Sequence, residues 1–318
     1  MEVTKPTSRA GAWAGVARWF DNESSMVERE GSSAKAIDLP RLLPFLLMHA
    51  GCIAVFWVGV SRTAVLIAAV LYAVRMFAIT GFYHRYFAHC AFRTSRFTQF
   101  IFAVLGATGV QRGALWWASQ HRHHHANADQ PADVHSAHQH GFFWSHMGWF
   151  MARGNFRTRS ELIKDFAGFP ELVFLDRFDS LVPALYGALM FAIGYGIDAL
   201  WPQSGTTGAQ TLVWGYVLAT IAMHHVTFAI NSLTHASRIG KRRYLTQDKS
   251  RNVWWLALFT FGESWHNNHH HFAASARLGF FWWEVDIGFY VIRTLAACGL
   301  AWDLKRAPQR YLFPQTDN

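Results

Sequence analysis

Apolar runs alternate with polar segments along the chain, and four of these runs are long enough to cross a lipid bilayer. A transmembrane helix needs about 20 predominantly apolar residues. The four runs cover residues 42–60, 63–82, 181–201 and 211–230. Short turns join the first run to the second and the third to the fourth, so each pair is expected to form a helical hairpin. The pattern predicts an all-α membrane protein built on a bundle of four transmembrane helices.

Two further apolar stretches, residues 97–117 and 278–300, contain charged residues. We expect them to be helices that lie in the membrane interface or roof the bundle. Polar side chains inside the four spans are costly in lipid, so they should face protein or a water-filled cavity. These residues are Arg75, His224, His225 and, as an ordinary helix-contact residue, His49.

The positive charge is concentrated in two long polar segments. Residues 84–180 contain ten lysines and arginines and residues 236–318 contain eleven, whereas the turn 202–210 has none. Cytoplasmic loops of membrane proteins carry such an excess, so both segments are predicted to form one cytosolic cap. The net charge of +9 is therefore an orientation signal. No basic patch interleaved with aromatic residues suggests a nucleic-acid partner.

The chain is expected to form one domain over residues 41–305. A polar segment, 1–40, precedes this domain and lacks the basic-then-apolar layout of a cleaved signal peptide. A short tail, 306–318, follows it. Both termini and the cap are expected on the cytosolic side. The mean hydropathy of +0.08 is low for a pure transmembrane bundle and agrees with a large water-facing part.

The chain has 18 histidines, and three groups of them have a regular spacing. The groups are His84 and His89; His121, His124 and His125; and His266, His269 and His270. In the last two groups the spacing i, i+3, i+4 places three imidazoles on one face of a helix. His123 and His271 point about 100° or more away from that face. Asn231 and His235 share a face at the end of the fourth span, and the topology brings all four groups to one side of the membrane.

Neutral imidazole is a ligand suited to iron, zinc, copper or nickel. The converging groups supply too many histidines for one tetrahedral zinc site, which needs four ligands, so two metal ions are expected to share them. Iron is favoured over zinc only if the site activates oxygen, because zinc has no redox chemistry. The excess of ligands disfavours a zinc hydrolase. A non-enzymatic metal transporter or sensor would carry more polar residues through its spans.

The motif set resembles that of the membrane-bound fatty-acyl desaturases, and its details are similar to the stearoyl-CoA desaturase branch, in a bacterial form. The segments that follow that branch in order and spacing are Tyr83–His89, Gly141–Trp149, Asn231–His235 and Gly262–His270. The resemblance covers about residues 40–305. It implies a four-span bundle capped by a cytosolic helical domain that holds a histidine-rich dimetal site.

The resemblance also implies the roles of individual residues. It makes nine histidines the ligands of two iron ions (Fe²⁺/Fe³⁺). These are His84, His89, His121, His124, His125, His235, His266, His269 and His270. It implies that Asn231 reaches a metal through water and that Gln111, Trp117 and Thr227 line the bend of an acyl tunnel. Without the family, ordinary packing would account for Trp117 and Thr227. Three acids near the ligands are candidates to orient imidazoles, or else ordinary surface or capping residues. They are Asp129, Asp133 and Glu263.

The implied reaction is an oxygen-dependent desaturation in fatty acid biosynthesis. A mid-chain methylene has no acidic proton, so general acid–base groups cannot start it. The expected product has a cis double bond between C9 and C10 of a saturated acyl chain. Acyl-CoA is favoured as substrate over a phospholipid-bound chain. A diiron fatty-acyl hydroxylase of the same superfamily is the nearest alternative.

The expected partners are O2, the lipid bilayer and an electron donor. No haem-binding cytochrome domain follows Trp302. We therefore expect electrons to come from a separate ferredoxin-like or cytochrome b5-like protein with its reductase. The bacterial cytoplasmic membrane is favoured over the endoplasmic reticulum.

Overall fold

The computed structural model describes residues 19–22, 35–236 and 239–313. Most of the polar segment 1–40 and the end of the tail 306–318 lie outside the described residues. The described chain is mostly helical, as predicted, and its only strands are two short ones. They are β1 (Arg93–Thr94) and β2 (Ala301–Trp302), which pair antiparallel.

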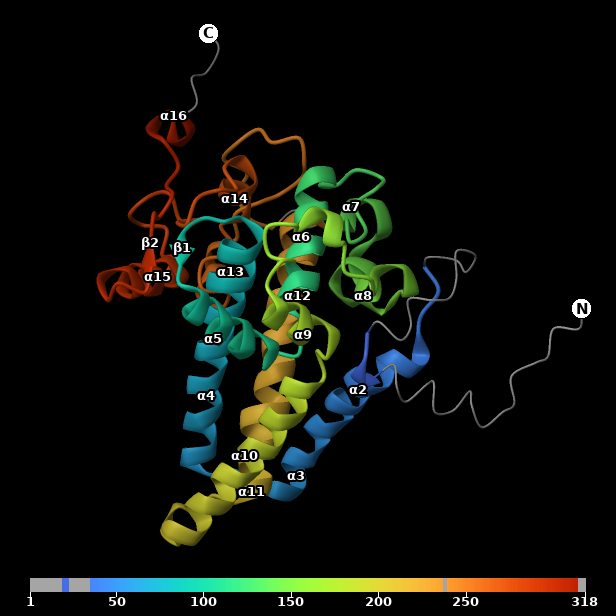
Figure 1. Cartoon of the computed structure of the whole chain (residues 1–318), viewed down its shortest axis with the longest axis vertical. Coiled ribbons are helices and arrows are strands. Elements are labelled where there is room, and N and C mark those ends of the chain that lie inside the picture. The colour runs from blue at the N-terminus through green and yellow to red at the C-terminus, as the bar shows by residue number, and fades with distance from the viewer. Residues whose placement is uncertain (1–18, 23–34, 237–238, 314–318) are drawn as a thin grey trace, which may run out of the picture.

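The helices form a bundle, in the lower part of Figure 1, and a cap above it. The bundle helices are α2 (Leu39–Gly51), α3 (Val55–Val58), α4 (Arg62–Phe77), α10 (Leu181–Leu200), α11 (Gly208–Thr211) and α12 (Ala219–Ala236). Two π-helical segments extend α4 and lead into α12, namely η3 (Ala78–Ala88) and η8 (Leu212–Leu218). The remaining α-helices are α5 (Arg96–Ala107), α6 (Ala114–Asn127), α7 (Ala137–His140), α8 (Trp149–Met151), α9 (Pro170–Arg177), α13 (Trp254–Phe259), α14 (His266–His271), α15 (Ile287–Ala297) and α16 (Gln309–Leu312).

Four helices are long and apolar enough to cross a membrane, which confirms the predicted four-span bundle. They run over Arg41–Val58, Arg62–Ala88, Leu181–Leu200 and Gly208–His235. The second and fourth continue beyond their predicted ends at residues 82 and 230. The fall in hydropathy there does not end the helix, because the cap buries the polar side chains that follow. His84 and His235, for example, are both buried.

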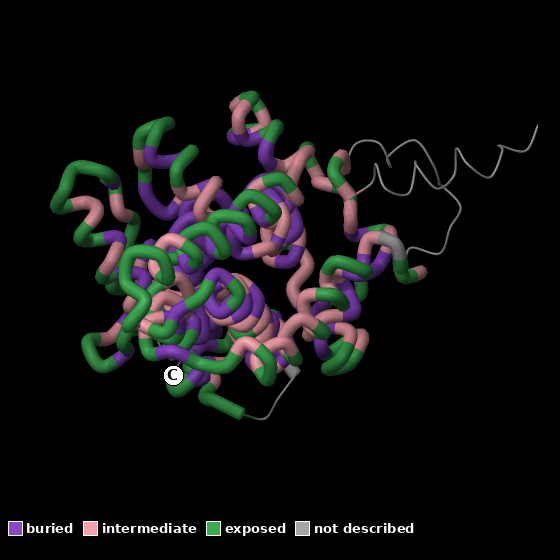
Figure 2. The backbone as a smooth tube through the Cα atoms, turned by 90° about the horizontal axis from the view of Figure 1, so that it is seen from below, coloured by how far each residue is buried: buried purple, intermediate pink, exposed green. Residues whose placement is uncertain are grey.

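The outer face of the bundle is apolar and exposed. Phe56, Trp57 and Leu200 leave 84%, 78% and 89% of their surface open. Seen end-on, buried stretches gather toward the middle of the molecule and exposed positions lie around its outline (Figure 2). Apolar side chains that face outward over several helices are the surface that a bundle presents to lipid.

The polar residues inside the spans face protein, as predicted. The buried Arg75 guanidinium donates a hydrogen bond to Thr220 Oγ1 at 2.6 Å. His224 Nε2 donates to a backbone carbonyl at 2.8 Å. His49 Nε2 lies 3.2 Å from His225 Nε2 where α2 meets α12, so His49 is a helix-contact residue. These contacts offset the cost of placing polar groups at membrane depth.

The prediction of one interfacial helix over residues 97–117 is wrong. α5 ends at residue 107 and α6 begins at 114. In the turn between them, Val110 and Arg112 have φ angles of +56° and +69°, which a right-handed helix does not allow. The Arg112 side chain reaches Asp179 Oδ2 at 2.9 Å, so this charge is paired within the protein and does not face the membrane surface.

The stretch 278–300 is likewise only partly helical, because α15 covers just its second half. Asp286 explains the difference. Its carboxylate accepts hydrogen bonds from the backbone N–H of Leu278 at 2.7 Å and of Phe289 at 2.9 Å. The first bond folds residues 278–286 into turns, and the second caps the start of α15.

Candidate metal centre

Four segments that are far apart in the sequence meet where the bundle joins the cap. η3 and the residue after it carry His84 and His89, and α12 carries Asn231 and His235 near its end. α6 and α14 carry the two groups with i, i+3, i+4 spacing. Each segment is helical at the site, so the spacing of the histidines fixes the direction in which they point.

The spacing of His84 and His89 is explained by the π-helix. The backbone N–H of His89 donates to the carbonyl of His84 at 3.2 Å, which is the i→i+5 hydrogen bond of a π-helix. In an α-helix, residues five apart point about 140° away from each other. The wider turn instead brings the two rings together, with their centroids 4.8 Å apart.

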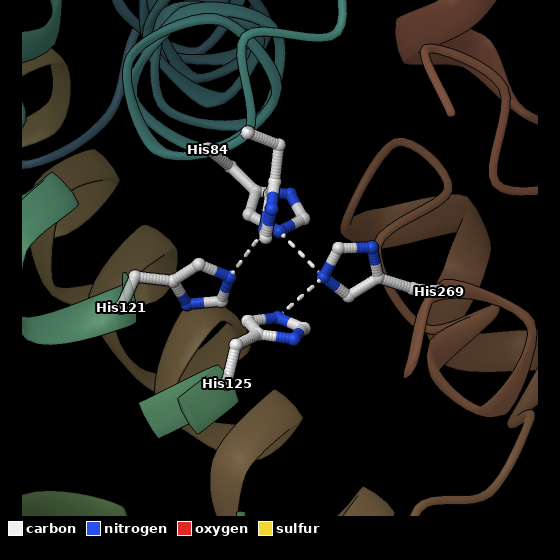
Figure 3. Close-up of side chains that lie close together, drawn as sticks. His84, His121, His125 and His269 are labelled. Carbon is white, nitrogen blue, oxygen red and sulfur yellow. Dashed lines mark hydrogen bonds between the residues drawn. The ribbon is translucent and has the colours of Figure 1, made fainter. Parts of the chain in front are cut away.

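The nine histidines fall into two groups, in each of which the ligating nitrogens lie within 4.8 Å of one another. The five-histidine group is His84, His89, His121, His125 and His269. The four-histidine group is His124, His235, His266 and His270. Figure 3 shows four members of the first group turning their ring nitrogens toward a common centre. His123 and His271 belong to neither group, in agreement with the helix geometry.

The ring nitrogens within each group are in close contact. His269 Nε2 lies 3.0 Å from His84 Nε2 and 2.8 Å from His125 Nε2. In the four-histidine group, Nε2 of His124 and of His270 are 3.4 Å apart. Nitrogens converge in this way around a shared positive charge.

Three carboxylates hold the rings of the four-histidine group from outside. They are Asp129 at 2.8 Å from His235 Nδ1, Asp133 at 2.9 Å from His124 Nδ1 and Asp248 at 3.1 Å from His270 Nδ1. An ionised carboxylate can only accept, so each Nδ1 donates and the Nε2 of the same neutral ring bears a lone pair. When both rings are neutral, as metal binding requires, His124 and His270 face each other with lone pairs. A cation satisfies this arrangement, so the donor set fits a metal ion.

Burial alone would lower the pKa of the His124 ring, but the ionised Asp133 raises it above its ordinary value. Burial favours the neutral form of other rings in the two groups, because desolvation disfavours a charged imidazole. It lowers the pKa of His125 and His269 well below the ordinary value and that of His270 to about 4. Burial alone would raise the pKa of Asp129, but hydrogen bonds from its neighbours bring that pKa to about 2. Neutral rings beside ionised carboxylates are the protonation states that metal binding needs.

The five-histidine group has a different outer charge. Glu263 contacts Nδ1 of His84, and the buried Arg85 guanidinium lies 3.0 Å from Glu263 and 2.9 Å from Asp286. The charge of Glu263 is thus shared between an imidazole and a guanidinium. The four-histidine group is therefore contacted by three carboxylates. The five-histidine group is contacted by one, whose charge an arginine partly neutralises.

The three acids named from the sequence all contact an imidazole, but two further residues at the site were missed. Asp248 lies 22 residues ahead of its partner His270, and no spacing rule connects the two. The His135 ring lies 4.4 Å from that of His124, and its Nδ1 is 3.5 Å from Asp133 Oδ1. Neither residue belongs to a recognisable motif, so only the folded chain relates them to the site.

A cavity adjoins both histidine groups. Its lining includes His84 and His121 of the first group, His266 of the second, and Asn231. Much of the rest is aromatic or aliphatic, such as Phe228. An apolar cavity with a few convergent polar groups has the character of a ligand site.

Gln111, Trp117 and Thr227 all line this cavity and are joined in one chain of hydrogen bonds. Trp117 Nε1 donates to Gln111 Oε1 at 3.3 Å, and Gln111 Nε2 donates to Thr227 Oγ1 at 3.3 Å. The Thr227 hydroxyl donates in turn to the Met223 carbonyl at 2.8 Å. The polar groups of this wall are therefore paired with one another, so the wall keeps a fixed shape next to the histidines.

A four-span bundle, two groups of converging histidines that could each hold a metal ion and an apolar cavity beside them are the features of a membrane protein with a metal site next to an apolar ligand site. The family model described as fatty acid desaturase matches residues 61–297. The chain belongs to this family, and it is therefore an oxidoreductase of lipid metabolism.

Proteins similar to this chain are named as acyl-lipid desaturases. Delta-9 acyl-lipid desaturase 1 of Arabidopsis thaliana is 35% identical over 274 residues, which cover 85% of this chain and 84% of the relative. The sn-1 stearoyl-lipid 9-desaturase of Anabaena variabilis is 33% identical over 282 residues, 88% of this chain and 98% of the relative. The Synechocystis protein of the same name is 35% identical over 254 residues, 78% and 74% of the two chains.

Proposed function

We propose that this chain is a diiron desaturase that introduces a cis double bond between C9 and C10 of a saturated fatty-acyl chain. The cavity that adjoins both histidine groups is the observation that carries the proposal. A mid-chain methylene has no acidic proton, so it must be held beside a redox-active metal rather than beside a general base. The bond position is supported by the names of the Arabidopsis and Anabaena relatives.

Two iron ions are the cofactor in this proposal. The nine histidines would hold them, with Asn231 contributing through water, since imidazole suits iron and zinc lacks redox chemistry. When bound, the iron pair supplies the ability to use O2 to remove hydrogen from an unactivated carbon. The carboxylates Asp129, Asp133, Asp248 and Glu263 orient the rings and keep their Nε2 lone pairs free.

In this proposal the cavity positions the acyl chain relative to the metal ions. Its apolar lining binds the acyl chain and excludes water, and the wall of Gln111, Trp117 and Thr227 places a bend next to His121 and His266. Holding one carbon–carbon bond in a bent conformation beside the metals selects both the bond that reacts and its cis geometry. Chain length beyond the bend is then set by the depth of the cavity.

The carrier of the acyl chain has two candidates. The resemblance to the stearoyl-CoA branch favours acyl-CoA. The names of the Arabidopsis, Anabaena and Synechocystis relatives favour a chain bound to a membrane lipid. Supplying purified enzyme in vesicles with either stearoyl-CoA or a stearoyl phospholipid, and following each product by mass spectrometry, separates the two.

The location and the source of electrons complete the proposal. The excess of lysine and arginine in the cap supports a cap, and a metal centre, on the cytosolic side of a bacterial cytoplasmic membrane. A separate ferredoxin-like or cytochrome b5-like protein with its reductase supplies the electrons.

Expression in a host that lacks its own desaturase tests the reaction. We expect a new monounsaturated fatty acid with a cis bond at C9–C10, identified by mass spectrometry after derivatisation of the double bond. A hydroxylated fatty acid in its place would assign the chain to the hydroxylase alternative. Unchanged fatty acids in a host that supplies a working electron donor would contradict both.

The number of metal ions is a direct prediction. Protein purified anaerobically with iron should contain about two iron ions per chain, because nine imidazoles in two groups exceed the needs of one site. Metal analysis by plasma mass spectrometry checks this. A value of one iron ion, or a preference for zinc under iron-replete conditions, would contradict the diiron assignment.

The proposed bend of the acyl chain is tested by changing the size of two side chains in the cavity wall. Thr227→Leu enlarges a side chain in the wall of the cavity that the acyl chain fills. Extra methylene groups in a filled space typically cost about 1–3 kcal/mol in strain, unless the substrate slides. We expect altered chain-length preference, a shifted double bond or slower turnover, with iron content intact. Trp117→Ala should loosen the wall and reduce activity more than it reduces folding.

Thr294→Leu, on the exposed face of α15, is the matched control and should leave the products unchanged. Gas chromatography of the fatty acids gives the readout for all three variants. If the Thr227 and Trp117 variants both give native rates and products, the wall is ordinary packing and the tunnel assignment is wrong.

A further inference from the structure

The loop between α12 and α13 covers the four-histidine group, and its side chains alternate in direction. Residues 241, 243, 245, 247 and 249 are exposed, whereas 244, 248 and 250 are buried. This alternation gives the loop an inner and an outer face with separate compositions.

The inner face is anchored to the metal centre. Asp248 contacts His270, and the backbone N–H of Lys249 donates to Asp129 Oδ2 at 2.7 Å. The Tyr244 ring stacks on that of His271, with centroids 4.0 Å apart and planes 8° from parallel. A single side chain, that of Asp248, therefore separates the backbone of this loop from a ring of the four-histidine group.

The outer face is basic, with one large apolar residue. It presents Lys241, Arg243, Leu245, Gln247 and Lys249. Leu245 leaves 98% of its surface exposed, in a segment whose other residues are polar. The outer face therefore combines positive charge with one fully accessible apolar side chain.

One of these cations is paired within the protein, because the Arg243 guanidinium lies 2.7 Å from the buried Glu284 carboxylate, and Lys241 and Lys249 carry the remaining positive charge. Residues 239–313 contain five acidic side chains. The four that are buried are Asp248, Glu263, Glu284 and Asp286. The fifth, Asp303, is exposed and lies 3.5 Å from Arg93. Apart from the pair of Glu284 with Arg243, these carboxylates contact the metal centre, the core or Arg93, so Lys241 and Lys249 leave the outer face positive.

We propose that the outer face of residues 241–249 is the docking surface for the electron donor, a small acidic redox protein. The inference rests on the proposed function, in which a separate protein supplies electrons. Desaturation combines O2, two electrons and two protons with a –CH2–CH2– unit and gives –CH=CH– and two water molecules. Two one-electron transfers from the donor are therefore needed for each double bond, and they must enter close to the metals.

The place of the loop favours a protein partner over the membrane surface. The Tyr244 hydroxyl donates to the Leu312 carbonyl at 3.1 Å, which sets the loop beside α16. In Figure 1, α16 lies at the end of the molecule opposite α3 and α11, on the far side of the cap from the bundle. Cations at this end face solution, where an acidic protein can reach them.

The test uses the full chain, loaded with iron and embedded in nanodiscs, and an acidic plant-type [2Fe–2S] ferredoxin as the probe. Stopped-flow absorbance follows oxidation of the reduced ferredoxin by the oxidised enzyme at increasing KCl concentration. Lys241→Glu/Lys249→Glu should lower the second-order rate constant at least about tenfold at low salt and flatten its salt dependence. Leu245→Asp should weaken binding of the ferredoxin.

Two controls separate docking from other effects. Lys164→Glu reverses an exposed charge outside this loop and should leave the rate within about twofold of native. Dithionite, a small reductant that needs no docking surface, should reduce the iron of all variants equally.

Native ferredoxin rates in Lys241→Glu/Lys249→Glu, or an equal loss in Lys164→Glu, would overturn the docking proposal. The proposal would also fall if Lys241→Glu/Lys249→Glu weakened the binding of the embedded enzyme to separate vesicles of anionic lipid but left the reaction with ferredoxin unchanged. That result would assign the face to lipid. Enzyme whose iron dithionite cannot reduce, or that forms no unsaturated product with any donor, would instead contradict the proposed function itself.

Discussion

His269→Ala is expected to abolish product formation, with a loss of at least about 100-fold, while the protein remains in the membrane. The His269 Nε2 atom is close to both His84 and His125, so its removal opens the five-histidine group at its centre. Loss of a partner outside the ligand shell alone costs about 10–100-fold in metal affinity or activity, and loss of a ligand should cost more. Fatty-acid analysis of a desaturase-deficient host measures the product, and immunoblotting of the membrane fraction measures the protein.

His124→Ala should have the same effect through the four-histidine group, because this residue bridges Asp133 and the facing ring of His270. His123→Ala is the matched control. It removes a neighbouring imidazole that belongs to neither group, so most of the activity should remain. Activity retained in both His269→Ala and His124→Ala would refute the ligand assignment, and a loss in His123→Ala equal to that in His124→Ala would refute the helix geometry.

Asp248→Asn is expected to weaken iron binding at the four-histidine group by about 10–100-fold, with a parallel loss of product. The amide oxygen can still accept the hydrogen bond from His270, but the negative charge behind the ring is lost. Iron content, measured after equilibration with increasing chelator concentrations, gives the shift in affinity. One of the two iron ions should leave before the other.

Asp303→Asn removes the same charge from an exposed position, where the aspartate side chain is 62% open to solvent. It should leave iron content and product unchanged. If Asp248→Asn also retains both iron ions up to the chelator concentrations that the native protein withstands, the carboxylate does not support the metal. Its contact with His270 then serves only to hold the loop.

Most of the bundle and most of the histidines could be predicted from the sequence, because both depend on local periodicity. The length of the four apolar runs was enough to predict four membrane-spanning helices. The spacing of His121, His124 and His125 required only that α6 be helical, which places these rings on one face. The same reasoning places His123 outside the groups.

The remainder depends on tertiary contacts that leave no local pattern. The two histidines of the second span could be named from the sequence, but the π-helix that turns His89 back toward His84 could not. Asp248 became part of the site only when its loop folded over His270. The two stretches expected as interfacial helices failed for a related reason. The positive φ angles of Val110 and Arg112 interrupt the first stretch, and the contacts of Asp286 delay the start of the helix in the second.

The origin of the ligands in four separate segments has a consequence for biogenesis. Histidines from η3, α6, α12 and α14 must all be present, and α14 follows the fourth span, so iron can be captured only after every span has been inserted. A ligand that binds only the folded state stabilises it in proportion to its concentration. In the proposed diiron enzyme, iron would therefore stabilise the contact between cap and bundle. Cells starved of iron should accumulate chains with an open cap, which membrane proteases remove, so that the abundance of the protein follows the iron supply.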